Sequence, residues 1–294
     1  MYNVSENIRY YRELIGMTRK QLAEGICDAS TLYRIEKGEQ IPRLDVLTGI
    51  CHKLRIPLDF MVSQLNHIEL AKIEKYKKLC RELTYQDDYQ ALSIILDEFK
   101  KLINNIESEP EIQFNKRFIK WHEAIYLHEV ESNSVKAKEI LKSIYSGQIY
   151  TELDIGICNS LGYIKLKEQS IDISISYFKS AFNAIHDLPF IIDKTLPPLV
   201  GYNLAYCYYY QWKMNEAITV CYQVLEHLEI NQLSFKLGDT KHMLAKIYQR
   251  LGEFELAYEL LTQSIHLYNI ESKVNKYDKA KKDLQDLDEL RINY

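Results

Sequence analysis

A short stretch near the start of the chain, residues 16–38 with the sequence GMTRKQLAEGICDASTLYRIEKG, most constrains the fold. Its pattern predicts two short helices around a tight turn. Thr18 followed three residues later by Gln21 forms a capping box that starts the first helix, and Gly38 ends the second. A short exposed helix that is braced by another is the element that major-groove reading of DNA requires. We therefore expect this part of the chain to bind DNA.

The polar and basic face of the second helix, with its flanks, supplies the candidate DNA contacts. Side chains of this kind donate hydrogen bonds to base edges and phosphates. The predicted DNA-binding residues are Arg19, Ala29, Ser30, Thr31, Tyr33, Arg34, Lys37 and Arg43. Residues 1–65 hold nine Lys or Arg against eight Asp or Glu, so DNA contact must come from local clustering of positive charge.

Length and composition indicate a two-domain protein of the cytoplasm. A chain of 294 residues is too long for one small core. It has neither an apolar run of signal-peptide type nor a stretch of about 18 apolar residues, so we expect no membrane partner. The six cysteines are scattered singly, which favours reduced core thiols and no cofactor. The net charge of −4 argues against a protein coated in nucleic acid.

The chain is predicted to be all-α with two domains. Residues 1–65 fit five short helices, residues 66–75 a linker or linker helix, and residues 76–294 a helical-repeat domain. From about residue 70 the sequence runs in long helical patterns with little Gly or Pro. These boundaries separate a small N-terminal head from a large body.

Internal repeats organise the body. Residues 201–228 have the tetratricopeptide pattern, and residues 242–267 repeat it. Small residues mark the predicted helix crossings at Ala91, Ala137, Ser174, Ala217 and Ala257. Their spacings of 46, 37, 43 and 40 residues exceed the usual unit of ~34. We predict five helix pairs and a last helix over residues 273–290, stacked in a right-handed superhelix with a concave groove.

An enzyme is not supported by the residues. His122 and Glu123 with His128 superficially resemble a zinc-protease helix, but that chemistry needs histidines four residues apart, and here they are six apart. The sequence offers no Gly-rich phosphate loop after a strand and no nucleophile elbow. Carboxylates such as Asp88 and Asp283 are interpreted as helix starts and solvated faces. We expect no catalytic residue and no metal site.

The inner face of the predicted groove suits a short extended peptide. Asparagine amides pair with both halves of a peptide bond, tyrosine rings cover apolar side chains, and Lys or Arg holds a carboxylate. The predicted peptide-binding residues are Asn159, Tyr163, Asn203, Tyr206, Tyr210, His242, Lys246 and Arg81.

Alternatives stay open for several of these positions. Asn203 lies where the tetratricopeptide consensus itself favours Asn, so it has a packing role as its alternative. Arg81 belongs to a basic patch that either meets a carboxylate or is simply solvated. The long connection over residues 186–198 either covers one end of the groove or is a tolerated insertion.

The head resembles the helix-turn-helix domain of the Xre/Cro/phage-repressor family. The residues that carry the resemblance are Arg12, the Thr18–Gln21 box, Leu22, Ala23, Leu32, Arg34, Ile35, Glu36, Gly38, Pro42, Leu47 and the segment 54–57. The resemblance implies a structural ion pair between Arg12 and Glu36. The family commonly has Gln at the position of Arg19, where it contacts phosphate, and arginine can make this contact as a charge-assisted donor.

Head and body together resemble the peptide-sensing regulators of Gram-positive bacteria, the PlcR/PrgX/Rgg/NprR group, and within it the PlcR branch. The resemblance implies a homodimeric transcription factor that binds a palindromic site on double-stranded DNA. It also implies a short signalling peptide held in the groove, with Asn159 and Asn203 gripping its backbone. The alternative is an Xre-type repressor whose repeats bind a protein partner or serve only for dimerisation.

Overall fold

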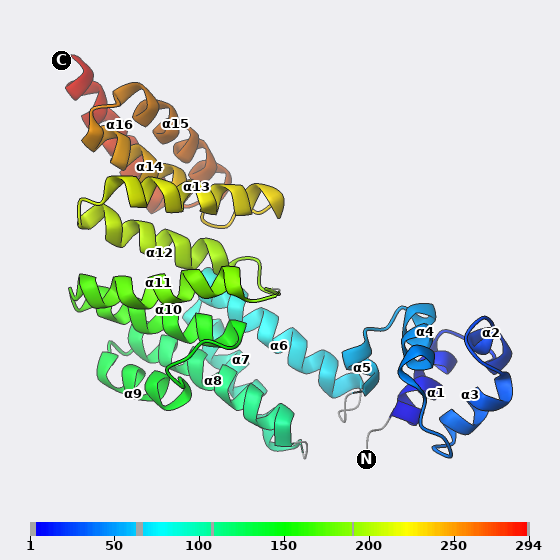
Figure 1. Cartoon of the computed structure of the whole chain (residues 1–294). Helices are drawn as coiled ribbons and strands as arrows, with labels where there is room; N and C mark the ends of the chain where they lie inside the picture. The colour runs from blue at the N-terminus through cyan, green and yellow to red at the C-terminus, as the bar shows by residue number, and fades with distance from the viewer. Residues whose placement is uncertain (1–3, 63–66, 107–108, 190, 293–294) are drawn as a thin grey trace. The chain divides into compact units, whose positions relative to one another are not determined.

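The computed structural model describes residues 4–62, 67–106, 109–189 and 191–292. These residues form sixteen α-helices, labelled in Figure 1, so the all-α prediction is confirmed. The chain divides into two compact units, residues 1–126 and 127–294. The predicted change from head to linker falls on residues 63–66, which lie outside the described residues, and stays a prediction.

The head contains the five predicted short helices. They are α1 (Val4–Leu14), α2 (Arg19–Ala23), α3 (Ala29–Glu36), α4 (Leu44–Leu54) and α5 (Leu58–Val62). The capping box starts α2: Thr18 Oγ1 accepts from the Gln21 N–H at 3.2 Å, and Gln21 Oε1 accepts from the Thr18 N–H at 2.9 Å. Gly38 follows α3 with a φ of 73°, a conformation that L side chains disfavour. The helices enclose one core, whose fully buried members include Ile8, Leu22, Leu32, Ile35, Ile50 and Met61.

The rest of the first unit is built on an aromatic core. Its helices are α6 (His67–Tyr85), α7 (Tyr89–Asn104) and the first part of α8 (Glu109–Glu129). The Phe99 ring of α7 lies between Tyr76, at 5.6 Å, and Phe118, at 6.2 Å between ring centres. Lys100 donates to Glu123 across 2.7 Å and joins the rim of α7 to α8.

The second unit continues the helix pairs. Its helices are α9 (Ser134–Ile144), α10 (Glu152–Lys167), α11 (Ile171–Asp187), α12 (Leu196–Tyr210), α13 (Met214–Ile230), α14 (Leu237–Leu251), α15 (Phe254–Ile270) and α16 (Val274–Ile292). Together with α6 to α8 they follow the predicted order of five pairs and a last helix. The pairs α10–α11, α12–α13 and α14–α15 pack closely within themselves, and α16 packs on α15. Paired helices stacking as repeats are therefore confirmed, while the right-handed sense of the superhelix stays a prediction.

One turn geometry recurs inside the helix pairs. Two residues before each second helix the backbone takes a positive φ, at Asp87 (59°), Ser132 (53°), Gln169 (61°), Trp212 (59°) and Gly252 (81°). In four of these turns the next N–H donates to the carbonyl five residues earlier, as from Ser170 to Lys165 at 2.9 Å. This bond is the mark of a Schellman end to the first helix. The repeats therefore have a common turn geometry without a common residue at the positive φ, since Gly252 is the only glycine among these five positions.

Glycines in the first helices let the second helices come close. A Cβ on Gly201 of α12 would lie 2.4 Å from a methyl of Val224, and one on Gly162 of α10 would lie 2.8 Å from the Phe178 ring. The first helices also touch from pair to pair, α10 with α12 and α12 with α14. We call α10, α12 and α14 the first-helix layer.

The long connection between α11 and α12 is tied at two places. The Glu152 carboxylate at the start of α10 accepts from the Ile192 N–H at 2.7 Å and the Asp193 N–H at 3.2 Å. The His227 ring of α13 pairs with the Lys194 carbonyl at 2.9 Å. Residue 190 of this connection lies outside the described residues. These bonds hold the connection against α10 and α13. They are compatible both with a cover over one end of the groove and with a tolerated insertion.

The cysteines are free thiols, and five of the six are buried. Burial raises the pKa of Cys80, Cys207 and Cys221 to about 12, so these thiols stay protonated at neutral pH. Among the described helices, none combines the length and apolarity that a membrane crossing needs.

The shared turn predicts a stabilising substitution. Gln169 is exposed and has a φ of 61°, whereas Gly252 occupies the same place in the last turn without a Cβ. We expect Gln169→Gly to stabilise the protein by about 1 kcal/mol, because it removes the left-handed penalty. Ser170→Gly, at the next residue with a φ of −89°, is the control and should not stabilise. Thermal unfolding followed by circular dichroism measures both, and equal melting temperatures for Gln169→Gly and wild type would contradict the argument.

Candidate functional site

Helix α3 presents the polar face that the sequence predicts. Leu32 and Ile35 are fully buried in the head core and fix the rotation of the helix about its axis. The opposite face is left at the surface, with Thr31 half-buried and Ala29, Ser30, Tyr33, Arg34 and Lys37 exposed. The core thus holds a short helix by one side and offers donors on the other.

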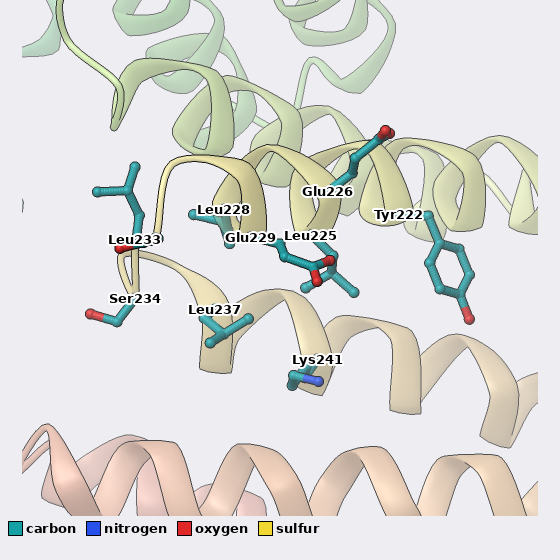
Figure 2. Close-up of a pocket in the computed structure, with 10 residues that line it drawn as sticks. Tyr222, Leu225, Glu226, Leu228, Glu229, Leu233, Ser234, Leu237 and Lys241 are labelled. Carbon is teal, nitrogen blue, oxygen red and sulfur yellow. The ribbon is translucent and has the colours of Figure 1, made fainter.

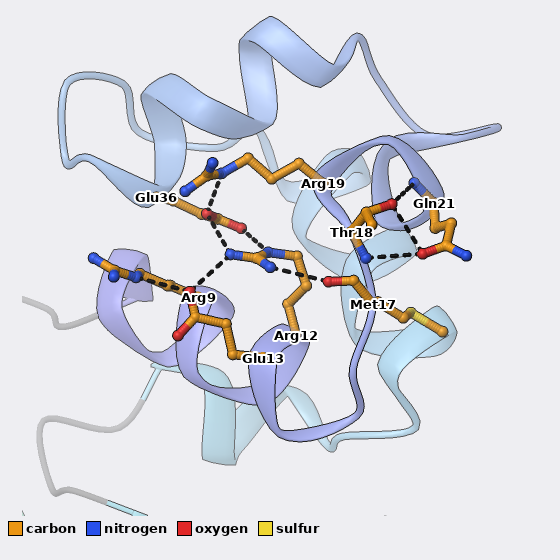
Figure 3. A network of polar contacts seen from close by, with 8 residues as sticks. All are labelled: Arg9, Arg12, Glu13, Met17, Thr18, Arg19, Gln21 and Glu36. Atoms are coloured by element: carbon orange, nitrogen blue, oxygen red, sulfur yellow. Dashed lines mark hydrogen bonds and ion pairs between the residues drawn. The ribbon is translucent and has the colours of Figure 1, made fainter.

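A single carboxylate organises the residues behind that face (Figure 3). Glu36 is buried and accepts from Arg12 Nε at 2.6 Å and from Arg19 Nε at 2.7 Å. Arg12 also donates to the Met17 carbonyl at 3.0 Å, and its hydrogen bond to Glu36 raises the pKa of its guanidinium. The structure therefore brings Arg12 and Glu36 together and adds a second arginine, which ties α1, α2 and α3 to one buried charge.

Arg19 is anchored rather than extended freely toward a partner. Its guanidinium carbon lies 5.2 Å from the centre of the Tyr33 ring, and the Lys37 ammonium lies 5.9 Å from the same ring. Its side chain is 38% exposed, so it remains reachable while Glu36 orients it. Arg43 occupies the N-cap position of α4 without a capping hydrogen bond from its side chain, is strongly exposed, and pairs with Asp45 at 3.3 Å.

Asn159 and Asn203 meet in the first-helix layer. Asn203 Nδ2 of α12 donates to Asn159 Oδ1 of α10 at 3.0 Å, and both side chains are buried. This bond joins two residues that lie 44 positions apart. It leaves the amide NH₂ of Asn159 and the amide oxygen of Asn203 as one donor group beside one acceptor.

The predicted tyrosines continue the same layer. Tyr206 and Tyr210 of α12 have ring centres 4.6 Å apart, and Tyr210 is half exposed. Tyr163 of α10 packs edge-on to His128 and carries the Lys167 ammonium at 5.1 Å from its ring centre. Burial raises the pKa of Tyr206, so its hydroxyl remains a hydrogen-bond donor at neutral pH.

His242 and Lys246 of α14 belong to a charged network with α16. His242 Nε2 lies 2.7 Å from Asp283 Oδ2, and Lys246 Nζ lies 3.4 Å from the same oxygen. The expectation that Asp283 lies on a solvated face is wrong, because its side chain is only 20% exposed and is held by these two groups.

Asp239 forms the other half of the network. It is 5% exposed and accepts from Lys276 at 2.8 and 2.9 Å, from Lys236 at 3.2 Å and from the Tyr268 hydroxyl at 2.9 Å. Burial acts to raise the pKa of Asp239, but the two ammonium groups outweigh it and hold the pKa below its ordinary value. No motif in the sequence marks Lys236, Tyr268 or Lys276. Lys236 is the N-cap residue of α14, three residues before Asp239, whereas Tyr268 of α15 and Lys276 of α16 reach Asp239 only through the packing of the helices.

Arg81 belongs to the first unit. Its guanidinium carbon lies 5.4 Å from the centre of the Phe118 ring. It therefore packs on the aromatic core of α6 to α8, and a contact with a peptide stays a prediction.

A cavity of about 890 Å³ lies elsewhere, between α13 and the start of α14 (Figure 2). Its lining is mainly apolar with an acidic flank, and includes Leu225, Leu228, Leu233, Leu237, Glu226 and Glu229. None of the predicted peptide-binding residues lines it.

Fold and site together define a helix-turn-helix head followed by stacked helix pairs with a polar first-helix layer. Residues 8–61 match the helix-turn-helix family, so the head is a domain of that family. No curated protein matches the chain.

Three solved structures are similar over the whole chain. PlcR of Bacillus thuringiensis, in complex with the peptide PapR7 and DNA, is 22% identical with a TM-score of 0.79, covering 95% of this chain and 99% of PlcR. ComR of S. thermophilus, with DNA and its signalling peptide ComS, is 16% identical with a TM-score of 0.61, covering 97% of this chain and 99% of ComR. The SHP pheromone receptor Rgg2 of Streptococcus dysgalactiae is 14% identical with a TM-score of 0.58, covering 96% of this chain and 99% of Rgg2. The predicted resemblance is thus confirmed as a shared fold.

The charge pairing at Asp239 predicts a pH dependence of stability. Its pKa is lowered in the folded protein, against about 3.9 in an unfolded chain. The carboxylate therefore stabilises the fold above about pH 4, and this contribution is lost as the pH falls through the folded pKa. We expect Asp239→Asn to lower stability at pH 7 by about 3 kcal/mol and to flatten the fall in melting temperature below about pH 4.

Asp278→Asn, an exposed position on α16, is the matched control. It should follow the wild-type melting curve at every pH. Parallel curves for Asp239→Asn and wild type on the acid side would show that Asp239 is not the titrating group.

Proposed function

We propose that this protein is a peptide-responsive transcription regulator of the cytoplasm, with no enzymatic activity. It binds a palindromic DNA site as a homodimer through α3 of each head. A short signalling peptide binds across the first-helix layer and shifts the dimer to or from the geometry that fits DNA.

The head supports the DNA part of this proposal. Leu32 and Ile35 bury one side of α3 and leave Ser30, Arg34 and Lys37 exposed on the other. An arginine on such a helix can bind guanine with two hydrogen bonds. PlcR and ComR, which share the fold, were crystallised with DNA.

One observation carries the peptide part, the hydrogen bond between Asn159 and Asn203 at 3.0 Å. The bond fixes both amides and leaves a donor beside an acceptor, which is what one peptide unit requires. Partly buried tyrosines flank the pair on α10 and α12 and can cover apolar side chains. PlcR and ComR were also crystallised with short peptides.

Population shift connects the two parts. A stack of repeats is soft along its axis because each repeat touches only its neighbours, and a peptide that contacts several first helices favours one spacing between them. Two recognition helices must lie about 34 Å apart, or a multiple of this, to enter successive major grooves. A differential peptide affinity of a few kcal/mol is enough to change the occupancy of DNA.

A second candidate function has one observation in its favour. The apolar cavity between α13 and α14 suits a protein side chain better than an extended backbone, as expected for a repressor whose repeats bind a protein partner. In that case the first-helix layer has no peptide to bind, so the peptide experiment below separates the two candidates.

Arg34 should carry sequence-specific DNA binding. We expect Arg34→Ala to weaken binding to a duplex selected from random sequence by the wild-type protein by about 5- to 150-fold, and to relax the preference at one base pair. Arg9→Ala removes the same charge from α1, where Arg9 pairs with Glu13, and should change affinity far less. Gel shifts at fixed salt measure both, and equal losses would show that α3 does not read the bases.

Asn159 should carry peptide binding. Asn159→Asp keeps an acceptor for the Asn203 amide but replaces the NH₂ donor with a charged oxygen. We expect affinity for synthetic heptapeptides enriched on the wild-type protein to fall about 10- to 100-fold, because a buried acceptor on the peptide loses its partner. Isothermal calorimetry with the full chain measures the change.

Asn183→Asp makes the same chemical change on the exposed side of α11 and is the matched control. It should bind the peptides as the wild type does. Retention of full affinity by Asn159→Asp, or failure of the wild-type protein to enrich any heptapeptide, would contradict the peptide proposal and favour the protein-partner alternative.

A further inference from the structure

The charged network between α14 and α16 holds more positive than negative charge. Asp239 is saturated, since its two oxygens accept from two ammonium groups and the Tyr268 hydroxyl. Asp283 Oδ2 likewise lies within 2.7 Å of His242 Nε2 and 3.4 Å of Lys246 Nζ. Leaving the His242 imidazole out of the count, the three lysines Lys236, Lys246 and Lys276 face two carboxylates, which leaves an excess of one positive charge among these groups.

That excess sits in a partly buried place, where it is costly. The side chain of Lys236 is only 22% exposed. Burial lowers its pKa, the Asp239 carboxylate acts against this, and the ammonium groups of Lys276 and Lys273 lower it further. Lys273 has a carboxylate of its own, since its Nζ lies 2.7 Å from Glu271. Lys236 and Lys276 instead share Asp239, so an added anion would relieve their repulsion.

The network includes α14 of the first-helix layer and reaches α12. Lys236 Nζ lies 4.9 Å from the centre of the Tyr202 ring of α12, one residue before Asn203. Lys246 lies one turn of α14 beyond His242, and both face Asp283 of α16. A chain that pairs with Asn159 and Asn203 and continues past α12 would therefore meet these lysines next.

We propose that Lys236 and Lys276, the two lysines that share Asp239, form a subsite for one carboxylate of the bound peptide. This inference rests on the proposed function and adds the chemistry of the ligand: the peptide is anionic at its end over α14 and α16. Asp239 positions the two ammonium groups and does not contact the peptide. An excess of one charge matches a single carboxylate, which comes from the peptide's C-terminus or from an Asp or Glu side chain.

The test uses the full chain and four pools of synthetic heptapeptides. The pools combine a free or an amidated C-terminus with Asp and Glu present or replaced by Asn and Gln. We expect the wild-type protein to enrich carboxylate-bearing peptides, and selected acidic peptides to bind at least tenfold more tightly than their neutral analogues. A preference for the free over the amidated C-terminus identifies the carboxylate as C-terminal. A preference for Asp and Glu over Asn and Gln identifies it as a side chain.

Lysine variants locate the subsite. Lys236→Met and Lys276→Met should each reduce the acid preference severalfold while affinity for the neutral analogue stays within about twofold, and Lys276→Arg should restore it. Lys179→Met, an exposed position on α11, is the control and should keep the preference. Because the readout is a ratio of two peptides on one variant, a loss of folded protein does not imitate the expected result.

The outcomes separate the subsite from the function. Peptide binding without acid preference, or a preference that survives Lys236→Met and Lys276→Met together, overturns the subsite and leaves the proposed function standing. Absence of binding from all four pools overturns both.

Discussion

The close approach of each second helix to its first helix is the constraint on which the polar layer depends. Gly162 and Gly201 carry no side chain where Phe178 and Val224 press against them, and Phe178 is fully buried there. Burying an aromatic side chain of this size contributes about 1.5–3 kcal/mol. Because the second helices occupy the space behind the first helices, the first helices of successive pairs touch. This contact brings Asn159 within hydrogen-bond distance of Asn203.

Much of the fold was readable from the sequence, because hydrophobic periodicity and caps are local signals. The Thr18–Gln21 box and Gly38 placed the helices of the head, and small residues spaced 37 to 46 positions apart placed the pairs of the body. The common turn was not readable. Positive φ values at Gln169 and Trp212 follow from the way the pair closes and not from a residue type that favours them.

The site was predictable only as a set of separate residues. Asn159 and Asn203 were marked by their helices, but their mutual hydrogen bond depends on the distance between two pairs, which no local pattern encodes. Asp283 was misplaced for the same reason: α16 buries Ala280 and Leu287, but no local pattern shows that its packing turns the Asp283 carboxylate toward His242.

The head shows how one buried charge combines stability with function. Glu36 is almost completely buried, and such a carboxylate is tolerable only when its partners are close and well oriented. It has two, and Arg19 is the one that also reaches the surface beside Tyr33. The charge that holds α1 against α3 therefore also limits where Arg19 can point, so the core of the head sets the position from which Arg19 would make the proposed phosphate contact.

The hydrogen bond between Asn159 and Asn203 has a specific role in the proposed mechanism. A peptide unit that pairs with Asn159 and Asn203 need not break their bond, since each amide keeps a second hydrogen-bonding group. Binding then adds interactions that exist only at the spacing of α10 and α12 that closes the 3.0 Å bond. A ligand shifts a conformational equilibrium only by its differential affinity for the two states. In the proposed mechanism the amide bond is therefore the feature by which a peptide favours one spacing of the repeats over another.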